Sequence, residues 1–224
     1  MGAPTGTIVW DIETSGLFRD ESDILSISAS CGGEQFHSFV RPQRPIPAEA
    51  SRINKIYAED VADAPSYEEV ALAFMQWVRE VAGSRPLLVA YNGDTFDVPF
   101  LIYKNSSIDP SKFPAFEGVY TADPMRCAQS VYTRAQVGGS FRQSCLYAFL
   151  FGAAPPLEEQ HTSRGDVKAL QRIVEHETLR EVVFASARPL CDITGQHLKT
   201  LKLAGAGTAR STTHHASRKY ETSV

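Results

Sequence analysis

The most constraining feature of the sequence is an apolar, β-branched run, Thr7–Trp10, that leads directly into two acidic residues, Asp11 and Glu13. The run predicts a buried strand. Because successive side chains of a strand point to opposite faces, the carboxylates of Asp11 and Glu13 are expected on one face at the end of that strand. Neighbouring carboxylates repel each other, and hard divalent cations usually hold such pairs together. The alternative is that both acids end the strand in solvent, where Ser15 and Gly16 form a turn.

Alternating strand and helix patterns follow this first strand. Strands expected at residues 24–29 and 35–40 flank the turn at Gly32–Gly33 and predict an antiparallel meander with the first strand. Two more strands are expected at residues 86–90 and 119–121. Helices are expected at residues 48–57, 66–81, 96–103, 124–132, 141–152, 166–174 and 179–187. Five strands interleaved with helices predict an α/β fold.

A third acidic residue, Asp97, follows the strand expected at residues 86–90. Asn92 and Gly93 supply a turn after that strand, so Asp97 is expected near the start of the next helix, close to the carboxyl end of the strand. Ligands of α/β folds collect at the carboxyl ends of strands, which makes Asp97 a candidate site residue. The alternative is a first-turn aspartate that only the helix dipole favours.

A histidine and a fourth acid occur together late in the chain. Asp166 is expected near the start of a helix that continues to residue 174, and His161 lies on the loop just before it. A histidine tethered close to an acid is able to face a shared site while its loop moves. By itself, a histidine in such a place is more often a surface loop residue than a catalyst, and the residue type of His161 shows only that a base is available at neutral pH.

Charge is distributed unevenly along the chain. The net charge is −4, yet residues 198–224 carry five basic residues against one acidic residue, so the body is more acidic than the total. An acidic body argues against nonspecific coating of nucleic acid and agrees with a carboxylate-rich site. Residues 1–203 are expected to form one domain. Residues 204–224 are expected to be a flexible basic tail, because they include too few apolar residues to pack.

No apolar run approaches the roughly 18 to 20 residues that cross a bilayer, and the N-terminus lacks the pattern of a signal peptide. A cytoplasmic or nuclear location without a membrane partner is therefore expected.

Three motifs in one order carry a resemblance to a known family. They are the Asp-x-Glu of Asp11 and Glu13, the Asn-Gly-x-x-Phe-Asp that ends at Asp97, and the His-x-x-x-x-Asp of His161 and Asp166. This set resembles the DEDDh branch of the DnaQ-like exonuclease superfamily, from about residue 8 to residue 174, and is most similar to the three-prime repair exonucleases. The resemblance implies a ribonuclease H-like fold with a mixed five-stranded sheet flanked by helices.

The same resemblance implies a metal-dependent 3′→5′ exonuclease that releases nucleoside monophosphates from single-stranded or frayed 3′ ends, preferably of DNA. It assigns two Mg²⁺ or Mn²⁺ ions to Asp11, Glu13, Asp97 and Asp166, and the role of general base to His161. Contacts with the terminal nucleotide are expected from Thr14, Ser15, Leu17, Ile56, Asn92 and Phe96.

Two alternatives remain open on the sequence. The substrate could be RNA, because discrimination of the ribose is not readable from these residues. The chain could also be a module that captures nucleic-acid ends without cutting them, although such a module needs neither four acids nor the histidine. Dimerisation through an exposed strand edge is a further expectation from the family.

Overall fold

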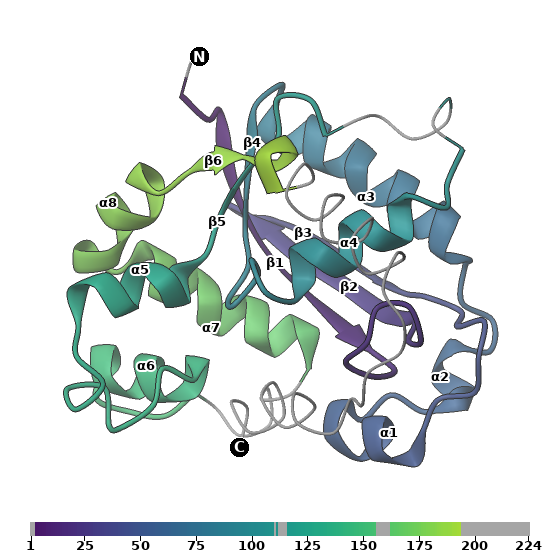
Figure 1. The fold of residues 1–224 in the computed structure, drawn as a ribbon, viewed down its shortest axis with the longest axis horizontal. Helices are drawn as coiled ribbons and strands as arrows, with labels where there is room; N and C mark the ends of the chain where they lie inside the picture. The colour runs from purple at the N-terminus through teal and green to yellow at the C-terminus, as the bar shows by residue number, and fades with distance from the viewer. Residues whose placement is uncertain (1–2, 110, 112–115, 156–161, 194–224) are drawn as a thin grey trace, which may run out of the picture.

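A mixed six-stranded sheet forms the centre of the protein, with strand order β3-β2-β1-β4-β5-β6 (Figure 1). The structure is a computed structural model, and it describes residues 3–109, 111, 116–155 and 162–193. The strands are β1 (Gly6–Thr14), β2 (Ile24–Cys31), β3 (Glu34–Phe39), β4 (Pro86–Val89), β5 (Tyr120–Ala122) and β6 (Arg188–Pro189). The expected tail at residues 204–224 lies outside the described residues.

The strand directions confirm the predicted fold class. Strands β1, β2 and β3 form the expected antiparallel meander, whereas β1 with β4 and β4 with β5 are parallel pairs. The sixth strand, β6, pairs antiparallel with β5 and was not predicted. It is only two residues long, so no period of side chains could reveal it.

Helices cover both faces of the sheet (Figure 1). The helices are α1 (Ala48–Asn54), α2 (Ala58–Val61), α3 (Tyr67–Ala82), α4 (Asp97–Asn105), α5 (Pro124–Val131), α6 (Gln143–Phe151), α7 (Ser163–Glu175) and α8 (Glu177–Ala185). Helices α3 and α4 pack on one face, and α5 to α8 share the core of the other face. Among the described residues, no helix is long and apolar enough to cross a membrane.

The side chains of β1 alternate between these two cores. Ile8, Trp10 and Ile12 are buried on the face covered by α3 and α4. Val9 points to the other core, which includes α7. Because the side chains alternate, Asp11 shares the face of Val9. On the face of β1 that packs toward α7, the apolar side chain of Val9 is therefore followed by the acidic side chain of Asp11.

The helix predicted at residues 48–57 ends early, at Asn54 of α1, and a separate short helix, α2, begins at Ala58. Lys55 adopts a left-handed conformation with φ of 59°, which ends α1. The side chain of Asn54 then accepts a hydrogen bond from the Ile56 backbone N–H at 3.0 Å, and Tyr57 is extended. An asparagine that bonds to nearby backbone competes with helix continuation, and periodicity alone does not register this competition.

Candidate functional site

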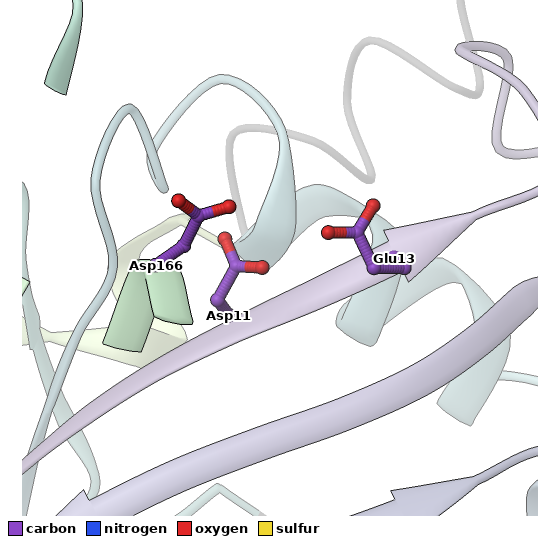
Figure 2. Close-up of side chains that lie close together, drawn as sticks. All are labelled: Asp11, Glu13 and Asp166. Atoms are coloured by element: carbon purple, nitrogen blue, oxygen red, sulfur yellow. The ribbon is translucent and has the colours of Figure 1, made fainter. Parts of the chain in front are cut away.

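Three acidic side chains from two elements converge at one place on the sheet. Asp11 and Glu13 come from β1 and Asp166 comes from the first turns of α7 (Figure 2). Each of the three offers one carboxylate oxygen, and these oxygens all lie within 4.8 Å of one another. The three side chains are half-buried, so the cluster is accessible from solvent. The structure thus brings together residues separated by up to about 150 positions in the chain.

The start of α7 explains how Asp166 reaches the cluster. The Oγ1 of Thr162 caps the helix and accepts the Gly165 N–H at 3.1 Å. Asp166 follows within the first turns, where the positive end of the helix dipole favours a carboxylate. The backbone carbonyl of Asp166 also accepts the Nε2–H of Gln143 from α6 at 2.7 Å. Capping and this cross-helix bond together hold the backbone that carries the Asp166 side chain.

The chemistry of this donor set fits a hard divalent cation. Two ionised carboxylates about 4 Å apart repel by about 4 kcal/mol at an effective dielectric constant of about 20. Three such groups within 4.8 Å of one another therefore favour a compensating positive charge. Carboxylate oxygens are the ligands that Mg²⁺, Mn²⁺ and Ca²⁺ prefer. Asp11, Glu13 and Asp166 are suited to hold such an ion.

The fourth predicted acid, Asp97, contacts the backbone of the strand that carries Asp11 and Glu13. Its side chain is fully buried at the start of α4, and its Oδ1 accepts the backbone N–H of Ile12 at 3.3 Å. The parallel partner β4 ends at Val89, opposite Val9, so β1 continues beyond the end of that strand. The Asp97 carboxylate takes the hydrogen-bonding place that a longer β4 would fill. Ile12 lies between Asp11 and Glu13, so Asp97 braces the strand that carries both.

A tight turn delivers Asp97 to this position. Asn92 adopts a left-handed conformation with φ of 55°, and its carbonyl accepts the N–H groups of Thr95 and Phe96. The carbonyl of Gly93 accepts the N–H of Val98 at 3.0 Å. Phe96 occupies the N-cap position of the helix that follows, without a capping hydrogen bond from its side chain.

Two further acids, Asp94 within this turn and Asp123 at the start of α5, tie the turn to neighbouring elements. The Oδ1 of Asp123, the N-cap of α5, accepts the N–H groups of Asn92 at 2.9 Å and of Met125 at 3.0 Å. The Oδ2 of Asp94 contacts Arg126 at 3.0 Å and Arg188 of β6 at 2.6 Å. Burial, followed by the neighbouring Asp94 carboxylate, raises the pKa of Asp123 to about 7, against the opposing effect of its backbone hydrogen bonds.

The expected substrate contacts occupy several environments. The hydroxyl of Thr14 donates to the Gly16 carbonyl at 2.7 Å, and the Ser15 hydroxyl accepts the Asp23 N–H at 2.8 Å, so both hydroxyls shape the loop after β1. Leu17 is half-buried against the core beneath α3. Ile56 is 5% exposed and packs with Leu25 and Val61.

The two remaining contacts lie in the turn before α4. Asn92 is half-buried there, and Phe96 is buried and packs on Phe100, with ring centroids 4.8 Å apart. His161, the expected general base, lies outside the described residues. Its role stays a prediction, as do the substrate contacts.

Sequence reasoning missed a group of buried serines beside the carboxylates. Ser26 and Ser28 of β2 and Ser163 of α7 form hydrogen bonds to one another. The available signal was the serine at every second position of β2, on the face that carries Asp11 and Glu13 in β1. Reading it requires the register between the two strands, which sequence patterns do not supply.

Comparisons with known proteins bear on this site. The sequence model of a family described as "Exonuclease" matches residues 8–173. A DNA polymerase III subunit epsilon-like protein of Rhodobacter capsulatus is 32% identical over 172 residues, which cover 72% of this chain and 22% of that protein. A DNA polymerase III subunit epsilon of Rickettsia conorii is 30% identical over 132 residues, covering 56% of this chain and 55% of that protein. The chain thus spans about half or less of the length of these relatives.

Solved structures show the same fold. The zinc-bound complex of Escherichia coli ExoI with single-stranded DNA superposes with a TM-score of 0.61 at 15% identity, covering 81% of this chain and 42% of ExoI. A complex named ExoI/SSB-Ct gives the same TM-score and identity, with 43% of that chain covered. At this identity the likeness concerns the fold, and it agrees with the ribonuclease H-like architecture predicted from the motifs.

Proposed function

Because this chain belongs to the exonuclease family, in the DEDDh branch of the DnaQ-like superfamily, we propose that it removes nucleotides from the 3′ ends of DNA. The observation that carries this proposal is the convergence of Asp11, Glu13 and Asp166, with oxygens within 4.8 Å of one another. The assignment to the three-prime repair exonucleases within that branch stays a prediction.

Four acidic residues have distinct places in the proposed site. Asp11, Glu13 and Asp166 would hold divalent cations, Mg²⁺ or Mn²⁺, and the family resemblance adds Asp97 and a second ion to this set. When bound, such cations favour attack by water and neutralise charge on the phosphodiester. In this structure Asp97 accepts the Ile12 N–H and thereby orients β1. It therefore also contributes to the position of Asp11 and Glu13, which flank Ile12.

The chemistry that the side chains would perform is hydrolysis of the terminal phosphodiester. His161 would accept the proton of the attacking water, whose oxygen forms a bond with phosphorus while the bond to the 3′-oxygen breaks. The products are a nucleoside 5′-monophosphate and a strand shortened by one residue. Thr14 at the end of β1, with Ser15 and Leu17 of the loop that follows, is adjacent in sequence to Glu13, and this segment would receive the terminal nucleotide.

Unpaired DNA ends are the proposed substrate. ExoI, which shares the fold, has been solved in complex with single-stranded DNA, and this complex supports the same class of ligand here. The polymerase subunits among the relatives make a polymerase assembly the proposed partner. A duplex end would have to fray before its last phosphodiester reached half-buried acids.

Matched 3′-end- and 5′-end-labelled single-stranded DNA and RNA, digested with Mg²⁺ or with EDTA, test the proposal. We expect stepwise shortening of DNA from the 3′ end, abolished by EDTA and reduced about 10³-fold in kcat by Asp11→Asn, since a cation contributes several kcal/mol. The control is Glu181→Gln, which removes an exposed acid of α8.

Each alternative has its own outcome in this experiment. Preferred shortening of RNA would assign the site to an exoribonuclease. Retained binding of 3′ ends without any shortening would identify a binding module and contradict the proposed hydrolysis.

A further inference from the structure

We propose that Ser26, Ser28 and Ser163 are positioning residues that hold α7 against β2 and thereby keep Asp166 beside Asp11 and Glu13. The inference rests on the proposed metal-binding role of these three acids. It assigns a task in the site to residues whose identity none of the expected motifs specifies.

The serines form a continuous buried network. The Oγ of Ser163 lies 3.1 Å from the Oγ of Ser26 and 2.7 Å from the Oγ of Ser28. The Oγ of Ser28 also lies 2.8 Å from the Nδ1 of His37 on β3. The serines are 1%, 1% and 3% exposed, so water competes little with these bonds. Buried hydroxyl groups depend on such partners, because leaving one unsatisfied is unfavourable.

One order of donors satisfies every bond of this network. Ser26 donates to Ser163, Ser163 donates to Ser28, and Ser28 donates to the His37 Nδ1. This order uses each hydroxyl hydrogen once and requires only a neutral imidazole with its proton on Nε2. Burial, followed by the charge of Arg164, lowers the pKa of His37, which favours the neutral ring. With the ring in this tautomer, every hydrogen bond of the network has both a donor and an acceptor.

Each serine is a direct neighbour of one acid of the cluster. In the antiparallel register, Ser28 lies opposite Asp11 and Ser26 lies opposite Glu13. Side chains of directly opposed residues share a face of the sheet. Ser163 precedes Asp166 by three positions on α7, so these two also share a helix face. The hydrogen bonds between β2 and α7 thus join the backbones that carry the carboxylates.

Mutual repulsion of the acids gives the network its task. Without a cation, the negative charges of Asp11 and Glu13 push Asp166, and with it the start of α7, away from the sheet. The bonds from Ser163 to Ser26 and Ser28 hold the start of α7 to β2, the strand paired with β1, and so oppose this displacement. They keep the acids gathered before a cation arrives, so binding requires less rearrangement.

A matched serine provides the control. Ser30 lies on the same strand face, and its Oγ donates to the Gln171 Oε1 of the same helix at 3.1 Å. Its partner across the register is Val9, and Gln171 is five positions beyond Asp166. Ser30→Ala therefore removes a similar hydrogen bond between β2 and α7 without touching the surroundings of the acids.

Titration of the metal-free full-length chain with Mn²⁺ in a calorimeter, with thermal unfolding of each variant, tests the inference. Ser163→Ala and Ser28→Ala should weaken Mn²⁺ binding about tenfold or more, as loss of outer-shell partners does. Ser30→Ala should change it less than about twofold, because the Ser30 bond joins α7 at Gln171, away from the start of the helix that carries Asp166. Ser163→Ala retains the Thr162 cap, so α7 should still form. Ser26→Ala removes only the hydrogen bond to Ser163 and is the variant to measure if the other two do not fold.

Two results would overturn the inference in distinguishable ways. Equal Mn²⁺ affinity in all serine variants, despite similar losses of thermal stability, would show that the network only stabilises the fold. Absence of Mn²⁺ binding by the wild-type chain, with Asp11→Asn indistinguishable from it, would overturn the proposed metal site as well.

Discussion

Asp123 shows at the scale of a single residue how burial and charge combine beside the site. Its Oδ1 accepts two backbone N–H groups, one from Asn92 in the turn that precedes Asp97 and one from Met125 in α5. Its side chain is buried close to the Asp94 carboxylate, and both effects raise its pKa to about 7. The Oδ1 of Asp123 thus holds two backbone segments together, while burial and the Asp94 carboxylate disfavour the ionised form of the same side chain.

This pKa predicts how stability depends on pH. An acid whose pKa is higher in the folded state retains a proton that the unfolded chain releases, so its contribution to stability is present at low pH. That contribution falls as pH rises from about 4 to about 7 and is constant above, with a slope of at most about 1.4 kcal/mol per pH unit. Asp123→Asn keeps an oxygen acceptor and removes this dependence. We expect the variant to gain stability over the wild type between pH 5 and pH 8.

Urea denaturation at several pH values measures this gain. The exposed Asp63 provides a control, since Asp63→Asn should follow the wild-type pH dependence. Equal pH dependence in wild type and Asp123→Asn would contradict the assignment of the raised pKa to Asp123.

At the scale of elements, the turn between β4 and α4 connects the sheet to Asp97. Gly93 lies where this turn packs most closely against Ala90. A Cβ added at Gly93 would lie 2.6 Å from the Cβ of Ala90 and 2.8 Å from its carbonyl oxygen. Ala90 directly follows β4, and its carbonyl accepts the Gly93 N–H at 3.1 Å. The glycine is needed here for this close approach, because only a residue without a side chain fits.

Gly93→Ala should therefore displace the start of α4 and move Asp97. We expect a loss of about 1–3 kcal/mol in unfolding free energy from the overpacked contact. Nuclease activity should fall by about 10²-fold, the scale of a 1 Å misplacement. The measurements are denaturant unfolding and kcat on single-stranded DNA.

Gly33→Ala provides the comparison for this variant. A Cβ at Gly33 meets no atom within 4 Å, and its backbone needs no left-handed conformation, so both measurements should stay close to wild type. An active, fully stable Gly93→Ala protein would show that the turn tolerates the displacement and that Asp97 does not depend on it.

At the scale of the whole molecule, the acidic cluster links α7 to β1 and should couple folding to cation binding. A ligand present at about 100 times its Kd stabilises the folded state by about 2.7 kcal/mol. For a domain of this size, that gain corresponds to a rise in Tm of about 5–10 °C. We expect Mg²⁺ or Mn²⁺ to produce such a rise, and EDTA to reverse it.

The variants Asp11→Asn and Asp166→Asn should lose most of this rise, because each removes one of the converging carboxylates. Both should retain or increase the Tm of the metal-free protein, since they also remove repulsion. Differential scanning calorimetry with and without the cation measures both effects. A rise of the same size in the variants would place cation binding elsewhere in the molecule.

Much of this architecture is determined locally and was predicted for that reason. The alternation of β1 places Asp11 and Glu13 on one face, as predicted from Thr7–Trp10 alone, because a strand has a side-chain period of two. The helix expected at residues 66–81 is α3, and its start is fixed by a capping box formed by the side chains and backbones of Ser66 and Glu69. Such features depend on residues a few positions apart, so the sequence by itself determined them.

Other features depend on contacts between distant segments, and only the tertiary structure decided them. Asp166 joins Asp11 because α7 packs across the sheet, and Asp97 reaches the Ile12 N–H because β4 ends at Val89. The serine network depends on the register of β1 with β2 and on the height of α7 above them. Periodicity and capping report local preferences, whereas these distances are set by packing the whole core, which places the acids where a cation could bind.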